Sequence, residues 1–186
     1  MAVDLGIKVP AVAVTDDGKV RFFGNGRKNK YMRRKFHSQR RELGKRKKIN
    51  AIKRLGDKEQ RWMRDQDHKV SRSIVNFAIE NEIAVIRLEE LAKIRQTTRT
   101  SRKNEKNLHT WSFYRLTHYI AYKANLAGIK VEYVYPAYTS KTCPQCSKRN
   151  KAKDRKYKCL ECGFEKHRDL VGALNILNAP VINGNS

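Results

Sequence analysis

The first part of the chain has the period-two spacing of β-strands. Apolar residues occupy every second position from 3 to 13, the alternation that strands show. The tetrapeptide at 15–18, Thr-Asp-Asp-Gly, is a strong turn signal, and the apolar stretch at 20–23 follows it. This pattern predicts an N-terminal β-hairpin or meander.

Helical spacing replaces this alternation further along the chain. Apolar residues interrupt a basic run over 27–61, which predicts basic helices rather than a tail. Val70, Ile74 and Phe77 mark the buried stripe of a second helix. The β-branched run at 83–88 is typical of a strand covered on both faces.

The second half continues the alternation of helices and strands. The polar residues 92–110 predict a mobile loop, and a helical pattern that opens at Trp111 continues to Ala127, where a glycine C-cap follows. A strand is predicted over 129–135, and the apolar stretch at 170–177 predicts the last helix.

Four cysteines form two Cys-x-x-Cys pairs separated by twelve residues. They are Cys143, Cys146, Cys159 and Cys162. Each pair offers two thiolates to one tetrahedral Zn²⁺, and a site filled by four protein ligands is closed and structural. Two disulfides or four free thiols are the alternatives. We expect zinc, because the chain is expected in a reducing compartment.

These patterns together predict an α/β fold with a mixed sheet flanked by helices. The segment 138–165 is predicted to be an inserted zinc ribbon rather than a separate domain. The main domain is then split into 1–137 and 166–180, and 181–186 is expected to be a frayed tail.

The charge of the chain predicts a polyanionic partner. Its 42 Lys and Arg against 18 Asp and Glu give a net charge of +24, with 16 basic and 3 acidic residues in 27–61 and eight Lys or Arg against one Asp in 141–158. Nucleic acid is the expected partner. The predicted phosphate contacts are Arg33, Arg34, Lys35, Arg40, Arg41, Lys45, Arg46, Lys47, Lys48, Lys148 and Arg149.

Composition also excludes several classes of protein. A hydrophobic fraction of 39% is too high for a disordered basic protein, and the apolar runs are too short to cross a bilayer. Residues 1–7 lack a basic leader and contain an acid, so we expect no signal peptide, no membrane partner and a cytoplasmic location.

Some individual residues have two interpretations. Tyr31 and Phe36 could stack on bases, but packing against the sheet is the expectation. His68 is expected to be a surface or capping residue, and His167 a solvated neighbour of Asp169, rather than metal ligands.

Three carboxylates stand where a charge is costly or concentrated. Asp4 lies within an apolar strand, Glu89 ends another, and Asp169 begins the last helix. Such a carboxylate must be paired with a cation, have a shifted pKa or coordinate a metal ion. Converging carboxylates would hold Mg²⁺ or Mn²⁺, and two such ions could drive phosphodiester hydrolysis. The ordinary alternatives are a pre-turn strand acid, a strand-end surface charge and a helix N-cap.

The order and spacing of these blocks resemble the C-terminal half of the TnpB proteins, also called OrfB-family transposases, which are relatives of the type V CRISPR effectors. The resemblance covers residues 1 to about 178. It rests on the segments 4–8, 86–91, 111–116, 122–124, 138–146, 159–163 and 167–176.

The resemblance implies an RNase H-like (RuvC) nuclease fold interrupted by a zinc ribbon. It implies a transposon-associated, RNA-guided DNA endonuclease whose catalytic triad falls on Asp4, Glu89 and Asp169, with guide RNA and target DNA as partners. Two departures stand out. Residues 169–172 read Asp-Leu-Val-Gly where many members have Asp-x-Asn-Ala. The lobe that grips the guide RNA is also expected to be missing, as in a truncated protein or in one that is split into two polypeptides.

A function of another class stays open. The chain could be a non-catalytic nucleic-acid-binding module that uses the basic helices and the ribbon while its acids hold no metal. The three acids favour the enzyme, and the expected absence of the guide-binding half favours the binding module. A strand-joining transposase, active in DNA recombination, would need a nucleophile or strand-transfer element that we do not identify in the sequence.

Overall fold

A five-stranded mixed sheet forms the centre of the protein. The computed structural model describes residues 1–90, 113–135, 139–150 and 155–182. The strands are β1 (Ala2–Leu5), β2 (Ala11–Val14), β3 (Val20–Phe23), β4 (Val85–Glu89) and β5 (Lys130–Val134), in the order β3-β2-β1-β4-β5. β1 pairs antiparallel with β2 and parallel with β4. The predicted α/β class and mixed sheet are therefore confirmed.

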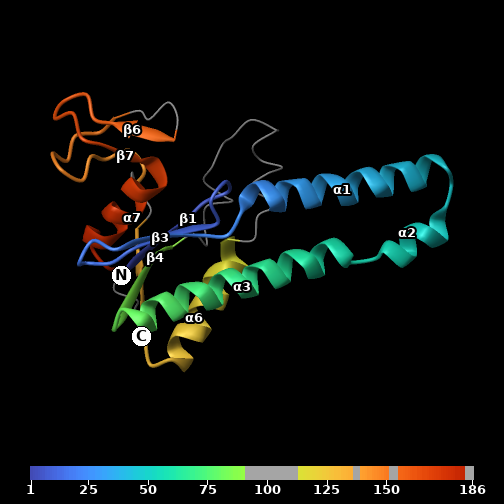
Figure 1. Ribbon diagram of the computed structural model, residues 1–186, viewed down its shortest axis with the longest axis horizontal. Helices are drawn as coiled ribbons and strands as arrows, with labels where there is room; N and C mark the ends of the chain where they lie inside the picture. Colours follow the sequence, from blue (N-terminus) through green and yellow to red (C-terminus); the bar gives the residue numbers. More distant parts are fainter. Residues whose placement is uncertain (91–112, 136–138, 151–154, 183–186) are drawn as a thin grey trace.

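Helices cover both faces of this sheet, and they differ between the faces (Figure 1). One face packs against α3 (Lys58–Glu80) and α6 (Phe113–Leu126), and the other against α7 (Arg168–Asn178). The first core contains Val3, Ala11, Ala13, Phe23, Ile74, Val75, Ile86, Leu88, Leu116 and Ile120. The second contains Ala2, Val12, Val14, Val134, Ala173 and Ile176.

The N-terminal segment forms the predicted meander, but not all of its alternating apolar residues lie in strands. The apolar positions 7 and 9 lie in a turn, which Gly6 N closes by donating to the carbonyl oxygen of Pro10 at 3.2 Å. All four residues of β2 are buried, because one helical layer covers Ala11 and Ala13 and the other covers Val12 and Val14.

A long helical arm extends from the sheet, as Figure 1 shows. It consists of α1 (Gly26–Lys45), α2 (Ile49–Leu55) and the first half of α3. Asn25 caps α1 by accepting from Lys28 N at 3.1 Å. The first residue of α1 must be glycine, because a Cβ on Gly26 would lie 2.2 Å from the carbonyl oxygen of Ile7.

The arm corrects the expectation for the two aromatic residues of the basic run. Tyr31 is 62% exposed and Phe36 is half-buried, and neither packs against the sheet. The apolar residues of α1 are too sparse to cover a sheet, so the helix packs along α3 and α2 instead. Stacking on bases therefore remains available to Tyr31.

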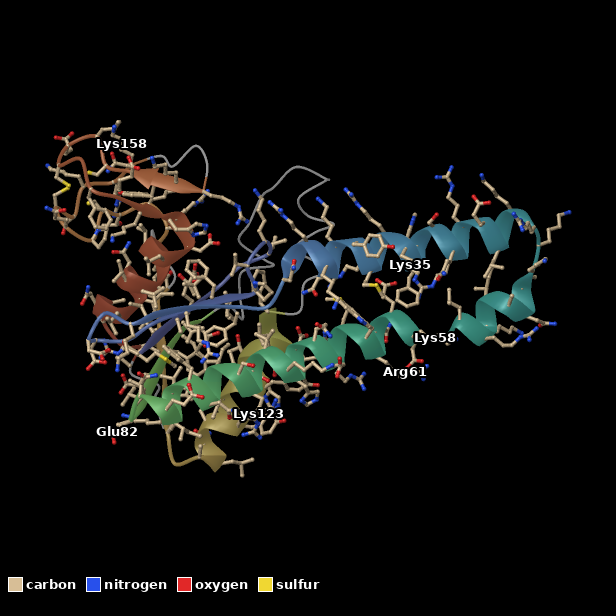
Figure 2. All side chains as sticks on the ribbon, in the orientation of Figure 1. Lys35, Lys58, Arg61, Glu82, Lys123 and Lys158 are labelled. Atoms are coloured by element: carbon tan, nitrogen blue, oxygen red, sulfur yellow. The ribbon has the colours of Figure 1, made fainter. Side chains whose placement is uncertain are left out.

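Polar contacts between α3 and α6 reinforce the body of the protein. The buried Lys123, where these helices pack in Figure 2, donates to His68 O at 2.8 Å and to Ser71 Oγ at 2.7 Å. Desolvation lowers the pKa of Lys123. His68 is exposed, as predicted, and its ring stacks on Tyr119 with 4.0 Å between the ring centroids.

The cysteine segment is a small unit beside α7. It contains the antiparallel strands β6 (Lys156–Lys158) and β7 (Glu165–His167). The expected frayed tail is wrong for its first two residues, because Val181 pairs with Val134 and Ile182 N donates to Tyr133 O at 2.8 Å. The free edge of β5 offers the unpaired groups that hold them.

Several expectations fall outside the described residues. They concern the loop at 92–110, the start of the helix at Trp111, and residues 183–186 of the tail. Among the described residues, none of the helices combines the length and the apolar composition that a membrane crossing requires.

Candidate functional site

Asp4 and Glu89 lie side by side on one face of the sheet. Val3 pairs with Leu88 in the parallel ladder of β1 and β4, so Asp4 and Glu89 follow this pair at the carboxyl ends of the two strands. Asp4 pairs with Val12, and Glu89 with Val134. Because both valines belong to the core under α7, both carboxylates occupy the α7 face.

The third acid comes to this place from the helix. Asp169 lies in the first turn of α7, whose N-terminus carries a partial positive charge that favours an anion. Its neighbour His167 is the N-cap and accepts from Asp169 N at 3.3 Å. The N-cap alternative for Asp169 is therefore wrong. His167 is half-buried, and its ring also packs edge-on against Phe22 with 5.3 Å between centroids.

The Asp4 carboxylate also lies directly against the backbone of α7. A Cβ on Gly172 would lie 2.8 Å from Asp4 Oδ2. Gly172 occupies the place where many TnpB-like sequences have alanine, and the side chain that it lacks leaves room for this approach. Val171, at the place of the missing asparagine, is fully buried among Cys143, Tyr157 and Cys159 and so packs the cysteine segment onto α7.

The electrostatics of the three acids are those of a crowded anionic site. Desolvation raises the pKa of Asp4 well above its ordinary value, and the negative charges of Glu89 and Asp169 raise it further. Desolvation also raises the pKa of Glu89, while a hydrogen bond from Thr139 opposes that shift. The site therefore favours a proton or a cation over three bare carboxylates.

This crowding predicts how stability depends on pH. Asp4 has a higher pKa in the folded chain than in the unfolded chain. Its stabilising contribution is thus complete below the unfolded pKa and is lost as the pH rises through the raised folded pKa. We expect Asp4→Asn to increase the free energy of unfolding at neutral pH by on the order of 1 kcal/mol and to flatten its pH dependence.

The measurement is thermal unfolding of zinc-loaded protein without Mg²⁺ or Mn²⁺, between about pH 5.5 and 8. The control is Asp16→Asn, which changes an exposed acid in the turn after β2. A less stable Asp4→Asn protein would mean that the carboxylate stabilises the fold.

Two further residues of this site, Thr139 and Asn175, are not among the site residues predicted from the sequence. Thr139 Oγ1 donates to Glu89 Oε1 at 2.5 Å. Asn175, on α7, donates from Nδ2 to the carbonyl oxygens of Thr139 at 2.6 Å and Thr142 at 2.8 Å. Thr139 and Asn175 fall within the segments that carry the TnpB resemblance, but neither residue type indicates such a contact without the fold.

The four cysteines converge as their spacing predicts. Their sulfurs lie within 4.8 Å of one another, with 3.6 Å between Cys143 Sγ and Cys162 Sγ and 3.5 Å between Cys146 Sγ and Cys159 Sγ. None of them is in a disulfide. Backbone N–H groups lower the pKa of the Cys159 thiol to about 6, while desolvation and the neighbouring sulfurs raise the pKa of the Cys146 thiol to about 12. A metal that binds all four sulfurs therefore has to displace protons from this cluster. A soft donor set of four sulfurs fits Zn²⁺, which prefers tetrahedral coordination.

Polar groups around the cysteines hold the two knuckles together. The buried Asn150 donates to Cys159 Sγ at 3.3 Å and to the Tyr157 hydroxyl at 3.2 Å, and it accepts from Leu160 N at 3.1 Å. Tyr157 itself is fully buried and donates to Lys141 O at 3.3 Å. Such contacts orient ligands before a metal binds.

The predicted phosphate contacts divide into two groups. In Figure 2, side chains with nitrogen at their tips line the face of α1 that points away from α3. Arg33 and Arg40 instead face the interior of the arm: Arg40 Nη1 donates to Glu59 Oε2 at 2.6 Å, and Arg33 is half-buried near Glu59 and Asp67. The exposed residues of the set are Arg34, Lys35, Arg41, Lys45, Arg46, Lys47, Lys48, Lys148 and Arg149.

Comparison with known proteins finds relatives among the Cas12f1 and TnpB-like proteins. Residues 113–176 match the family model of the Cas12f1-like TNB domain. The CRISPR-associated endodeoxyribonuclease Cas12f1 of Sulfoacidibacillus thermotolerans is 31% identical over 95% of this chain and 44% of its own length. A TnpB-like protein of Methanocaldococcus jannaschii is 33% identical over 67% of this chain and 45% of its own length.

Solved structures show the same likeness. A cryo-EM structure of a Cas12f1–sgRNA–target DNA complex contains a chain that superposes with a TM-score of 0.77 at 26% identity. The match covers 95% of this chain and 48% of that one. This chain thus spans less than half the length of these two curated relatives and of the solved chain.

Proposed function

This chain is a relative of the TnpB proteins and of the Cas12f1 type V effectors, and on that premise we propose that it is the DNA endonuclease domain of an RNA-guided, transposon-associated nuclease. The sheet with its helices is then a RuvC-like nuclease fold, and the cysteine segment is its zinc ribbon. One observation carries the proposal: Asp4, Glu89 and Asp169 lie near one another between the sheet and the start of α7, close enough for the charges of Glu89 and Asp169 to raise the pKa of Asp4.

The donor set fits the metal that such a nuclease uses. Carboxylate oxygens are the ligands that Mg²⁺ and Mn²⁺ prefer. Burial and the neighbouring negative charges raise the pKa of Asp4, so a cation would be favoured there. Divalent ions supply a Lewis acid for the phosphodiester and a water of lowered pKa. Asp4 and Glu89 would hold them from the sheet, and Asp169 from α7.

The three carboxylates do not close around a single ion as the four cysteines do. Among the described residues, only the four cysteines form a group of three or more ligands close enough to surround one ion. The three carboxylates are more widely spread. Ligands of two ions about 3.5–4 Å apart are distributed around both, as a two-metal mechanism requires.

The partners follow from the charge of the surface and from the relatives. The exposed Lys and Arg side chains of α1 and of the ribbon would bind phosphates. A net charge of +24 favours a polyanion such as nucleic acid as the partner. The chain of known structure is bound to guide RNA and target DNA. We therefore take DNA as the target and guide RNA as a partner, with a guide-binding lobe on the same or another polypeptide.

The test is cleavage of target DNA in the presence of Mg²⁺ or Mn²⁺, with guide RNA and an N-terminal lobe from a TnpB relative supplied in trans. Metal-dependent cleavage is the expected result. Tight DNA binding without any cleavage would instead support the non-catalytic nucleic-acid-binding module, the alternative that leaves the acids without metal.

Nucleic-acid binding by the chain should depend strongly on salt and weakly on sequence. Replacing Arg34, Lys35 and Arg41 together by Gln should weaken DNA binding. It should also reduce the slope of log Kd against log salt by about one for each phosphate that the variant no longer neutralises. Fluorescence anisotropy on duplexes of two unrelated sequences, between about 50 and 200 mM salt, measures both effects.

Arg40→Gln is the matched control for this surface. Because Arg40 binds Glu59 and so connects α1 to α3, the Arg40→Gln substitution should lower the melting temperature. It should leave the slope of log Kd against log salt nearly unchanged. Unchanged affinity in the triple variant would show that this part of the basic run is only a solvated face.

A further inference from the structure

A chain of hydrogen bonds connects the candidate catalytic site to the start of the zinc ribbon. Glu89, at the end of β4, accepts from the Thr139 hydroxyl at 2.5 Å. The carbonyl oxygen of Thr139 in turn accepts from Asn175 Nδ2 at 2.6 Å. The three residues come from a strand, the segment before the first cysteine and α7, so they join separate parts of the fold.

Each contact in this chain has a defined direction. The Thr139 hydroxyl has one proton, and donating it to Oε1 fixes the orientation of the Glu89 carboxylate and therefore the direction of Oε2. The Asn175 amide has two N–H donors, and the carbonyls of Thr139 and Thr142 accept from them. An aspartate at 175 would place acceptors against acceptors.

The segment that Asn175 holds is also part of the ribbon. Thr142 pairs with Arg149 across the first cysteine knuckle, and Cys143 N donates to Lys148 O at 2.9 Å. A displacement of this knuckle would therefore move the Thr139 hydroxyl as well. The position of one carboxylate in the sheet thus depends on a segment that lies 50 residues away in the sequence.

We propose that Thr139 is a positioning residue that orients Glu89 for metal binding, and that Asn175 acts through Thr139 by holding its segment on α7. The inference rests on the proposed role of Glu89 as a metal ligand. It extends the nuclease site to the entry of the zinc ribbon. Hydrogen-bond partners of metal ligands typically contribute about ten- to a hundredfold to metal affinity or activity.

Mn²⁺ binding to the zinc-loaded chain tests this proposal without cleavage. The readout is the Mn²⁺ dissociation constant from electron paramagnetic resonance. Thr139→Val should weaken binding about tenfold, and Thr139→Ser, which keeps the hydroxyl, should restore it. Asn175→Ala should weaken it similarly. Asn178→Ala, which changes an exposed amide at the end of the same helix, should not.

A double-mutant cycle separates positioning from general stability. In a Glu89→Gln background the added effect of Thr139→Val on Mn²⁺ affinity should vanish, because the residue acts through the carboxylate. A loss of melting temperature or of zinc would persist in that background. An undiminished effect of Thr139→Val in the cycle would therefore overturn the proposal, as would a Thr139→Val protein with wild-type Mn²⁺ affinity.

Asp4→Asn separates failure of this inference from failure of the proposed function. If Asp4→Asn loses Mn²⁺ binding while Thr139→Val keeps it, the metal site exists and the positioning role is wrong. If Asp4→Asn binds Mn²⁺ as the wild type does, the proposed nuclease site itself is wrong, and the positioning role falls with it.

Discussion

Replacing Asp4 by Asn should reduce the rate of Mg²⁺- or Mn²⁺-dependent cleavage by roughly a thousandfold or more, while nucleic-acid affinity stays nearly unchanged. Asp4 is the acid that both neighbouring acids crowd, and its carboxylate lies against α7 at the centre of the site. The phosphate contacts lie on Lys and Arg elsewhere, so the two measurements should separate. Initial cleavage rates under the guide-supplied conditions and anisotropy binding curves are the readouts.

Single and combined substitutions should be equally damaging. Because the three carboxylates act as one unit, Asp4→Asn alone should cost about as much activity as the triple variant that also changes Glu89 and Asp169. Asp16→Asn, in the exposed turn, is the matched control and should cleave normally. Full cleavage by Asp4→Ala would show that the acids are structural and that the site is wrongly assigned.

Loss of zinc should unfold the cysteine segment. The core of that segment is small, with Tyr157 as its one large fully buried side chain among the described residues. Metal binding therefore has to supply its folding free energy. Structural zinc in zinc-finger peptides contributes an apparent free energy of about 10–16 kcal/mol at neutral pH, which is large compared with what so small a core can supply. We expect one zinc per chain in protein purified without chelator, and none after Cys159→Ser.

Leu160→Ser is the matched control, because Leu160 lies in the same knuckle, is 85% exposed and offers no ligand. Elemental analysis gives the stoichiometry. Proteolysis near residue 150 and the melting curve report unfolding of the segment and its effect on the sheet. A zinc-free protein whose cysteine segment stays protected would contradict the expectation, and a disulfide would be the first alternative to examine.

Features that depend on neighbouring residues are predictable here from the sequence. The two Cys-x-x-Cys pairs identify a four-ligand group because each pair lies in one tight knuckle. The apolar period of the segment ending at Phe77 likewise predicts the buried stripe of α3. The resemblance to TnpB adds the three acids as a set, which neither composition nor spacing could establish.

Features that depend on which surfaces meet are not predictable in this way. Tyr31 is an aromatic residue of the kind expected to pack in a core, but it is exposed because α1 extends away from the sheet. Arg40 looks like its basic neighbours, yet it is bound to Glu59. The tail at Val181 looks irregular but pairs with the open edge of β5.

The sequence alone thus determines most local elements, the four-cysteine cluster, the basic surface and the class of fold, because each depends on residue type and short-range spacing. Only the tertiary structure decides that Asp4 and Glu89 share the α7 face and that Thr139 and Asn175 join this site. The physical reason is that strand register and helix docking depend on the burial of whole faces. Contacts between residues far apart in the chain follow from that burial, so they cannot be predicted from any one segment of the sequence.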